Sequence, residues 1–290
     1  MKKVLVVLFF FLILSFIPNS FADDELFVCD YFRGVVEKID SSGSRSSFIN
    51  DLGSPNDVAF DTLGNLYTTD TDDQKVYKIN SSGTVTDFAT VISPQHVAFD
   101  GYDNAYISDG STGNIFKITS GGTSSVLATG FKNESGLAYN YYDNFLYAGD
   151  SSGNISKISS DGTKTAFTSG LGKITEMEFD AYQNLYVASI DSTDIHKVTP
   201  DGTASIWASG FTRPYSLAFD NDNNLYVGDD VLDAIYKITP TGTRSVFSSG
   251  IASPTGMDFA YNKPFITPEP ASFLLFGIGL FSFGILRRRQ

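Results

Sequence analysis

Cysteine, histidine and basic side chains are scarce in this 290-residue chain. Its single cysteine, Cys29, excludes a disulfide within the chain. Only two histidines, His96 and His196, are present to supply imidazole chemistry. The 20 Lys and Arg residues are outnumbered by 33 Asp and Glu residues, which gives a formal net charge of −13. Because such a surface repels nucleic acid and anionic lipid, neither is expected as a partner.

Helical periodicity is also missing between the two ends of the chain, and a strand-like repeat takes its place. The repeated motif is an aromatic residue followed three positions later by Asp, or once by Ser. Successive copies are separated by 40, 39, 41, 39 and 40 residues. The six copies occupy residues 27–30, 67–70, 106–109, 147–150, 186–189 and 226–229. A period near 40 with strand-like content is typical of a radial or stacked array.

Each repeat contains four short strands with alternating apolar residues. In the last complete repeat they are expected at 214–220, 225–229, 234–239 and 244–247, separated by Gly, Asn, Asp or Pro. A glycine recurs between the third and fourth strands, where a hairpin favours a positive φ angle. These glycines are Gly43, Gly83, Gly122, Gly162, Gly202 and Gly242.

The phase of the repeat against the chain ends predicts how the array closes. The first clear strand, 26–30, is of the second type, and the last, 256–260, is of the first type. If the last strand joins the first three, every blade has four strands and no sheet end is left open. We therefore predict an all-β fold, a six-bladed β-propeller of four-stranded antiparallel blades that is closed by the C-terminal strand. An open β-solenoid is the alternative, although it would not need matched ends.

Both ends of the chain have the composition of targeting segments. Lys2 and Lys3 precede an apolar run at 4–17, and small residues at 20–22 offer a cleavage site, so residues 1–22 are interpreted as a Sec signal peptide. An uncleaved anchor is the alternative, but 14 apolar residues are short for a membrane span. Residues 23–267 then form the propeller domain.

The C-terminal segment, 268–290, combines three features in order. Pro268-Glu269-Pro270 precedes an apolar stretch at 271–286, and an arginine cluster follows at Arg287, Arg288 and Arg289. This order resembles the PEP-CTERM sorting signal of Gram-negative bacteria. The resemblance implies export across the inner membrane, a transient C-terminal membrane anchor, recognition by an exosortase, and a final location at the cell surface or outside the cell. A plain tail anchor is the alternative, but it would not explain the Pro-Glu-Pro triplet.

The repeat itself resembles the NHL family of propellers and its gluconolactonase-like and virginiamycin B lyase-like relatives. The residues that carry the resemblance are Leu217-Ala-Phe-Asp220, the run 224–229 and the run 238–243. It covers roughly residues 26–260 and implies the architecture more strongly than any activity, because function depends on sites placed on a fold.

Candidate site residues lie at the start of the first strand of each blade, where six strands converge on the central channel. One register contains Asn56, Gln95 and Tyr215, which are candidates for substrate binding. The next register places Asp57, His96 and Glu176 around one opening, and these are candidate metal ligands or acid–base groups. The alternative is that a water-filled channel simply tolerates isolated polar residues.

Other polar features favour structural interpretations. The aspartates that end the repeated motif are expected to set the following turns by accepting backbone N–H groups. The run 220–224 lacks the Gly and Glu of a calcium loop and is interpreted as a blade hairpin. His196 is expected in a third strand, away from the channel.

Two functional hypotheses follow from these residues. The first is an exported, non-catalytic propeller that binds glycan or protein through the channel mouth, where Tyr141 and Tyr142 could add an aromatic surface. The second is a divalent-metal-dependent lactonase-type hydrolase or virginiamycin B lyase-like enzyme that uses Asp57, His96 and Glu176 with one cation such as Ca²⁺. The gluconolactonase-like metal set is incomplete here, since Asn56 matches its asparagine but the equivalent positions of the other blades hold neither a carboxylate nor a second asparagine.

Overall fold

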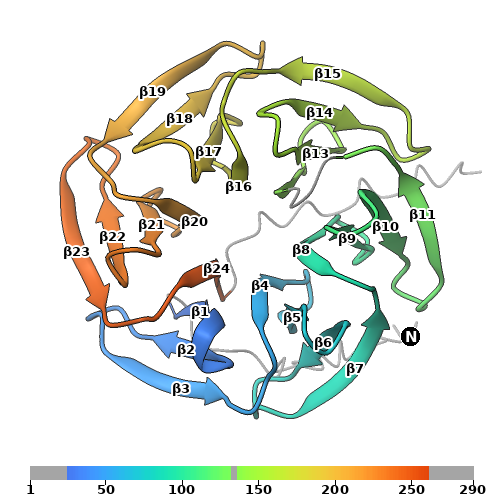
Figure 1. Ribbon diagram of the computed structural model, residues 1–290, viewed down its shortest axis with the longest axis horizontal. Coiled ribbons are helices and arrows are strands. Elements are labelled where there is room, and N and C mark those ends of the chain that lie inside the picture. Colours follow the sequence, from blue (N-terminus) through green and yellow to red (C-terminus); the bar gives the residue numbers. More distant parts are fainter. Residues whose placement is uncertain (1–24, 132–135, 261–290) are drawn as a thin grey trace, which may run out of the picture.

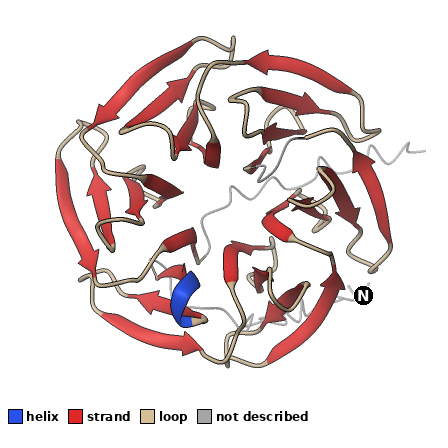
Figure 2. Ribbon diagram, in the orientation of Figure 1, coloured by secondary structure: helices blue, strands red, loops and turns tan. Residues whose placement is uncertain are grey.

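A computed structural model describes residues 25–131 and 136–260 of the chain. In this part of the chain, four-stranded antiparallel sheets form six blades around a central channel (Figure 1). Apart from one short 3-10 helix, its regular structure is all strand (Figure 2). The predicted signal peptide and sorting segment lie outside the described residues. Within the described residues, no helix is long and apolar enough to cross a membrane.

The blades are numbered along the chain, and their strands are given from the channel outward. Blade 1 contains β24 (Pro254–Phe259), β1 (Leu26–Asp30), β2 (Val35–Ile39) and β3 (Arg45–Ile49), with the 3-10 helix η1 (Tyr31–Arg33) after β1. Blade 2 contains β4 (Pro55–Phe60), β5 (Leu66–Asp70), β6 (Lys75–Ile79) and β7 (Val85–Thr90). Blade 3 contains β8 (Pro94–Phe99), β9 (Ala105–Asp109), β10 (Asn114–Ile118) and β11 (Ser124–Ala128).

The second half of the ring has the same arrangement. Blade 4 contains β12 (Leu137–Asn140), β13 (Phe145–Gly149), β14 (Ile155–Ile158) and β15 (Lys164–Thr168). Blade 5 contains β16 (Ile174–Phe179), β17 (Leu185–Ser189), β18 (Asp194–Val198) and β19 (Ala204–Ser209). Blade 6 contains β20 (Pro214–Phe219), β21 (Leu225–Asp229), β22 (Ala234–Ile238) and β23 (Arg244–Ser249).

The ring is closed by one strand against three, as the sequence predicts. The C-terminal strand β24 pairs antiparallel with β1, with Leu26 opposite Phe259 and Val28 opposite Met257. The Ala260 N–H donates to the Glu25 carbonyl oxygen at 3.0 Å and extends this pairing by one step. The prediction of a six-bladed propeller is confirmed, and the open solenoid is wrong.

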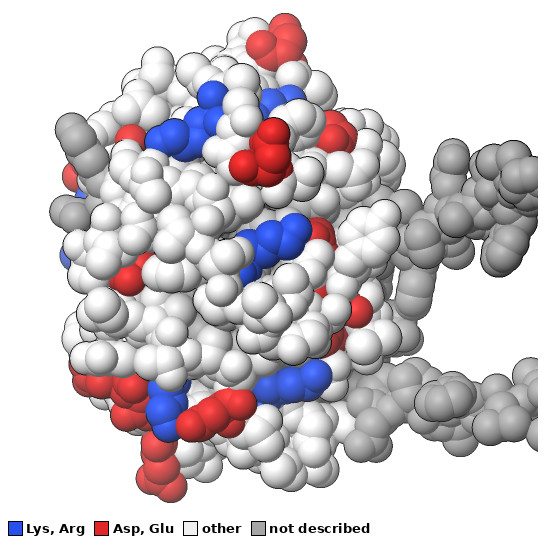
Figure 3. Space-filling model, turned by 90° about the vertical axis from the view of Figure 1, so that its right-hand side faces the viewer, with Lys and Arg blue, Asp and Glu red and all other residues white. Residues whose placement is uncertain are grey.

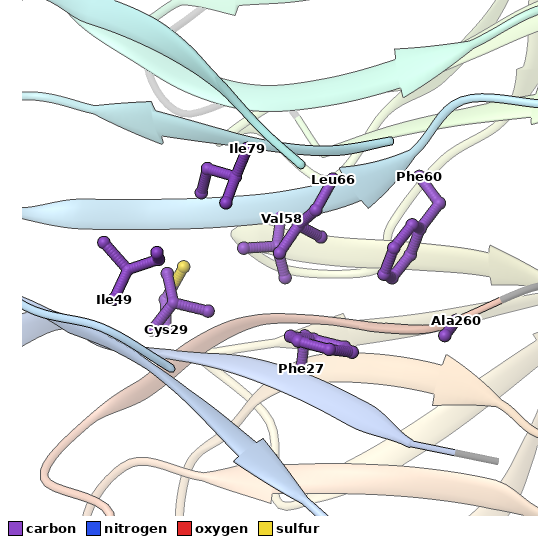
Figure 4. Close-up of a cluster of buried hydrophobic side chains, with 9 residues drawn as sticks. Phe27, Cys29, Ile49, Val58, Phe60, Leu66, Ile79 and Ala260 are labelled. Carbon is purple, nitrogen blue, oxygen red and sulfur yellow. The ribbon is translucent and has the colours of Figure 1, made fainter. Parts of the chain in front are cut away.

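The aromatic residue of the repeated motif packs between neighbouring blades. In blade 2, the Tyr67 ring centroid lies 4.9 Å from that of Phe88 on the outer strand and 4.6 Å from that of Phe99 in blade 3. Phe27 makes the same pair of contacts, with Phe48 on β3 and Phe60 in blade 2, and it lies in a buried cluster with Cys29 between blades 1 and 2 (Figure 4). Each such pair contributes roughly 0.5–1.5 kcal/mol beyond the burial of its area. The motif therefore repeats because every blade interface needs the same contact.

The aspartate of the motif has a structural role, as predicted. Asp70 accepts the backbone N–H groups of Gly53, Ser54 and Asp73 at 2.8, 3.0 and 3.0 Å, and thereby fixes the loop that enters its own blade. The third-to-fourth-strand glycines also behave as expected, since all six have φ angles between 80° and 87°.

The loops that join the inner strand to the second strand in blades 2 to 6 gather at one end of the ring, which we call the hairpin face. They comprise residues 61–65, 100–104, 140–144, 180–184 and 220–224. In the last of them, the Asp220 carboxylate accepts the Asp222 and Asn224 N–H groups and the side-chain amide of Asn224. This network confirms that 220–224 is a blade hairpin. Because the strands alternate in direction, η1 lies at the opposite end of the ring.

Charged side chains on the outer surface are scattered. On the side of the ring seen in Figure 3, lysine and arginine side chains lie near acidic ones among uncharged residues, and the part of the chain that the structure describes forms no continuous basic patch on this face. That surface offers no track for a phosphate backbone, in line with the acidic composition.

Candidate functional site

The structure brings Asp57, His96 and Glu176 together inside the channel. They lie on β4, β8 and β16, the inner strands of blades 2, 3 and 5. The Nδ1 atom of His96 is 3.5 Å from an Asp57 carboxylate oxygen and 3.4 Å from a Glu176 carboxylate oxygen. All three side chains are buried, with exposed fractions of 5%, 1% and 6% in chain order. We refer to these three residues as the trio.

Backbone amides on the inner strands hold the two carboxylates in place. The Asp57 carboxylate accepts the N–H of Val58 at 2.8 Å and that of Val97 in the next blade at 2.9 Å. Glu176 accepts the N–H of Met177 at 3.0 Å. An inner strand has no sheet partner on its channel side, so its amides need such acceptors. Asp57 therefore links two blades while it faces His96.

The pKa of His96 is raised by its acidic neighbours. Burial alone would lower it, but the charge of Glu176 and the close contacts with both carboxylates outweigh burial and raise the pKa of His96 to about 10. The imidazole is therefore protonated at neutral pH in the cation-free protein. A buried imidazolium between two carboxylates compensates charges that would otherwise repel each other.

The protonation equilibrium of Glu176 is shifted toward the neutral carboxylic acid. Burial, followed by the negative charge of Asp57, raises the pKa of Glu176 to about 7 against the opposing influence of His96. A carboxyl group with a pKa near ambient pH can both donate and accept a proton, which is what general acid–base chemistry needs.

Small residues at the same register leave room for the trio. Blades 4, 6 and 1 carry Gly136, Ser216 and Gly256 where blades 2, 3 and 5 carry the trio. A Cβ atom on Gly256 would lie 2.4 Å from the Asp57 Cα atom, and one on Gly136 would lie 3.2 Å from the Thr175 carbonyl oxygen. The three long side chains can meet because their neighbours in the ring are small.

The trio also fits a divalent cation. Ligand atoms from its three residues lie within 4.8 Å of one another, and the buried His96 Nδ1 makes no hydrogen bond of good geometry to any residue in 25–131 or 136–260. A tetrahedral ion with bonds of roughly 2.1 Å separates neighbouring ligands by roughly 3.4 Å, close to the two observed imidazole–carboxylate distances. One nitrogen and two carboxylates suit Zn²⁺ or Mn²⁺ better than Ca²⁺, which prefers six to eight oxygen ligands.

A cavity of about 450 Å³ lies between the trio and the hairpin face. Asp57 and Glu176 line its inner part, and the hairpins of blades 4, 5 and 6 line its mouth. Among the residues that the structure describes, six carboxylate residues and no lysine or arginine line this cavity; the six are Asp57, Glu176, Glu178, Asp180, Asp220 and Asp258. Its walls are also aromatic, with Phe99, Tyr139, Tyr141, Tyr142, Phe179 and Phe219. The cavity therefore combines negative charge with flat apolar surfaces.

The other predicted site residues lie at the opposite end of the inner strands. Asn56 is buried and donates from its side-chain amide to the Gln95 carbonyl oxygen at 2.9 Å, while Gln95 and Tyr215 are half-buried. None of the three lines the cavity, so their role in substrate binding stays a prediction. Tyr141 and Tyr142, by contrast, do line it. His196 lies on β18, the third strand of its blade, as expected.

Sequence reasoning missed Glu178 and Asp258, which also face the cavity. At their register, the other four blades all carry alanine: Ala59, Ala98, Ala138 and Ala218. A departure from the repeat was therefore visible here too, two positions beyond the trio. The tyrosine-rich hairpin of blade 4 was also visible in the sequence, because its extra residue lengthens the spacing between two successive motifs to 41 residues.

Comparisons with known proteins identify the C-terminal segment and the fold. Residues 267–289 match the model of the PEP-CTERM protein-sorting motif, one position from the predicted range. The motif implies export and sorting to the cell surface by exosortase. No curated protein sequence is significantly similar to the chain.

Solved propellers share the architecture at low sequence identity. A chain of a nidogen/laminin complex is 19% identical, with a TM-score of 0.75 over 83% of this chain and 99% of that one. Virginiamycin B lyase from Staphylococcus aureus is 14% identical, with a TM-score of 0.65 over 82% of this chain and 86% of that one. A streptogramin B lyase is 15% identical, with a TM-score of 0.57 over 67% and 68% of the two chains. The chain is thus a six-bladed β-propeller similar in structure to nidogen and virginiamycin B lyase, and it carries a C-terminal PEP-CTERM sorting motif.

Proposed function

We propose that this protein is an exported propeller of the cell surface or extracellular matrix that binds a glycan in its channel cavity without turning it over. The observation that carries the proposal is the cavity itself, which combines aromatic walls with polar side chains and opens on the hairpin face. A cavity of this size holds a small part of a large ligand, and pockets with few, convergent polar groups are the usual binding sites of folded domains. A protein ligand that inserts one side chain is the variant of this proposal.

The sorting motif supports the proposed setting. We expect the Sec machinery to export the chain, the C-terminal apolar stretch to hold it transiently in the inner membrane, and exosortase to process it. A protein delivered in this way meets extracellular polymers, and its acidic surface would keep it away from nucleic acid and anionic lipid.

A cavity-filling variant tests the binding role. Ala138 lines the cavity, and the equivalent position of the next blade carries Glu178. This strand position can therefore hold the longer glutamine side chain of the Ala138→Gln variant. On a glycan array, the exported protein should bind a defined set of glycans, and Ala138→Gln should lose that binding. Val126→Gln on the half-exposed outer strand of blade 3 is the control and should bind normally. Equal binding by all three proteins would exclude the cavity as the site.

A divalent-metal-dependent hydrolase or lyase is the second candidate, and one observation favours it. The ligand atoms of the trio lie within 4.8 Å of one another, close enough to share one cation. Such an ion would be held by Asp57, His96 and Glu176 and would polarise a bound carbonyl oxygen. The streptogramin B and virginiamycin B lyases share only the fold at this level of identity.

Metal analysis followed by activity assays separates the two candidates. An enzyme should be isolated with a stoichiometric cation and should hydrolyse lactones or cleave quinupristin, the compound present in a structure of catalytically inactive virginiamycin B lyase. Both properties should be lost in Glu176→Gln. A protein that binds its glycan normally but shows neither property supports the non-catalytic role.

A further inference from the structure

The two ends of the propeller lie side by side on the hairpin face. In blade 1, the inner strand β24 is the last strand of the described chain and the second strand β1 is its first. Glu25 and Ala260 therefore occupy the place that a hairpin fills in the other blades, and the backbone hydrogen bond between them is 3.0 Å long. The sorting segment is thus attached to the hairpin face and not to the opposite end of the ring.

The tether between the propeller and the apolar stretch of the sorting segment is short. Residues 261–270 separate Ala260 from the stretch that begins at 271. Even a fully extended tether of this length spans at most roughly 35 Å. It starts beside the channel, and a domain of this size is roughly 45 Å across, so the tether is too short to pass around the ring to its opposite end. While the apolar stretch lies in the membrane, the hairpin face is therefore the end of the ring that is closer to the bilayer.

Exposed apolar side chains follow the hairpin face through blades 2 to 5. They occupy the third position of each hairpin, and the equivalent residue of blade 6 is Asp222, so the hairpin forms without an apolar residue there. In chain order they are Leu63, Tyr102, Tyr142 and Tyr182, with exposed fractions of 66%, 70%, 56% and 74%. We call these four side chains the apolar arc. Because the scaffold does not require them, and because grouped apolar side chains mark interaction surfaces, a partner explains the arc better than the fold does.

Lysines of the third strands pair with the acids at the hairpin end of their own blades. Three of these ion pairs are close: Lys38–Glu25 at 2.8 Å, Lys157–Asp143 at 3.0 Å and Lys237–Asp220 at 3.2 Å. Two are looser, at 4.0 Å each: Lys78–Asp61 and Lys117–Asp100. These acids are therefore compensated within the protein, and apolar contact rather than charge decides what the face binds.

A zwitterionic lipid surface fits the apolar arc. Tyrosine combines an apolar ring with a polar hydroxyl group, and it is enriched at the membrane–water interface for that reason. The arc presents three tyrosines and a leucine on the end of the ring that the tether keeps near the bilayer. An anionic lipid surface fits less well, because the chain has a formal net charge of −13.

We infer that the apolar arc contacts the membrane surface while the C-terminal segment holds the protein in the bilayer, and that processing by exosortase frees the hairpin face. This inference rests on the membrane tethering that the proposed function includes. The cavity opens on the same face, so its mouth is turned toward lipid before processing and toward the matrix afterwards. Glycan binding then follows release from the membrane.

Fluorescent labels at the two ends of the ring test the orientation. The full chain without its signal peptide is reconstituted through its own C-terminal segment into phosphatidylcholine vesicles that contain a lipid with a nitroxide on its headgroup. Asp222→Cys places a label on the hairpin face outside the arc, and Ser152→Cys places one at the opposite end. Both positions are exposed, whereas the native Cys29 is buried. We expect the lipid to quench the label at position 222 at least about twofold more than the label at position 152.

A variant of the arc separates lipid contact from the effect of the tether alone. Tyr102→Ser/Tyr182→Ser removes two rings that do not line the cavity, and it should lower the quenching at position 222 by about half or more, because membrane binding scales with the apolar area that is buried. Phe32→Ser is the matched control, since Phe32 is 76% exposed on η1 at the opposite end of the ring, and it should leave the quenching unchanged.

The outcomes separate this inference from the broader proposal. Equal quenching at the two label positions would overturn the orientation, and unchanged quenching in Tyr102→Ser/Tyr182→Ser would overturn the arc as the contact surface. Protection of the label at position 222 from iodide, without quenching by the lipid, would indicate a second copy on this face and would also overturn the inference. Glycan binding is measured separately on an array. Failure of the full chain to float with the vesicles would contradict the tethering in the proposed function itself.

Discussion

The buried trio makes a sharp prediction about how stability depends on pH. In the cation-free protein, the pKa of His96 is about 10, whereas an unfolded histidine titrates near 6.5. Because the folded-state value is the higher one, the native protein holds a proton that the unfolded chain has released. The stabilisation is complete below pH 6.5 and is lost as pH rises toward 10. This separation corresponds to roughly 5 kcal/mol at most, and His96 is 1% exposed, so solvent screens it little.

A double variant, His96→Asn/Glu176→Gln, is the proper reference. Removing only His96 would raise the pKa of Glu176 further and leave that carboxyl titrating in the same range, whereas the double variant leaves Asp57 with its two backbone donors. Between pH 7 and pH 9, the free energy of unfolding of the wild type should fall by about 3 kcal/mol relative to the double variant, or about 1.4 kcal/mol per pH unit.

Urea unfolding followed by tryptophan fluorescence measures this difference. The single tryptophan, Trp207, packs edge-on against Tyr186 with centroids 5.0 Å apart, so its emission reports on the packing of blade 5. The measurement is made with a chelator at pH 7, 8 and 9. Parallel stability curves for the two proteins over this range would refute a protonated His96. Saturating Zn²⁺ or Mn²⁺ should remove the slope of the wild type, because a metal-bound imidazole cannot carry the proton.

Three further predictions concern other parts of the molecule. Gly256→Ala should lower the melting temperature, at a cost of about 1–3 kcal/mol, because its Cβ would lie 2.4 Å from the Asp57 Cα atom. Gly101→Ala has open space and should be nearly neutral in thermal unfolding. Glu176→Gln should reduce the affinity for Zn²⁺ at least tenfold in a competition titration, and unchanged binding would exclude the trio as the cation site. Replacing residues 268–270 by alanines should leave the protein in the membrane fraction of cells that contain the exosortase. Deletion of the exosortase should have the same effect on the unaltered protein. Release of the altered protein would contradict recognition through this segment.

The fold could be predicted from the sequence because the repeat carries the same physical demands six times. Each blade interface needs an aromatic residue such as Tyr67, and each entering loop needs an acceptor such as Asp70, so both residues recur at a fixed period. The closure could be predicted from the types of the first and last strands. An array that starts with the second strand of a blade and stops with the first strand of a blade can complete its ring in one way.

The site could be predicted only in part. The register at the start of the inner strands identified Asp57, His96 and Glu176 as departures from the repeat, but their contact depends on the small residues Gly136 and Gly256 beside them. The sequence pattern also could not show which end of the channel is hollow. That depends on side-chain volume summed over six strands, and this sum leaves the cavity on the hairpin side rather than beside Asn56.

The fold could be predicted more fully than the site because positions that repeat between blades and positions that differ between blades have different roles. Positions that carry the same residue in every blade make contacts that every blade needs, so a substitution at one of them lowers the stability of a blade interface. Positions that disagree face the channel, where the six blades meet a single axis and no two blades need the same residue. Acidic residues at Glu178 and Asp258, against alanine in the other four blades, lie beside the trio in the same channel. A ligand that enters this channel therefore contacts residues that differ between blades. The register of the trio and the register of Glu178 and Asp258 both depart from the repeat in charge. Because they follow one another along the channel axis, they point to a single continuous site.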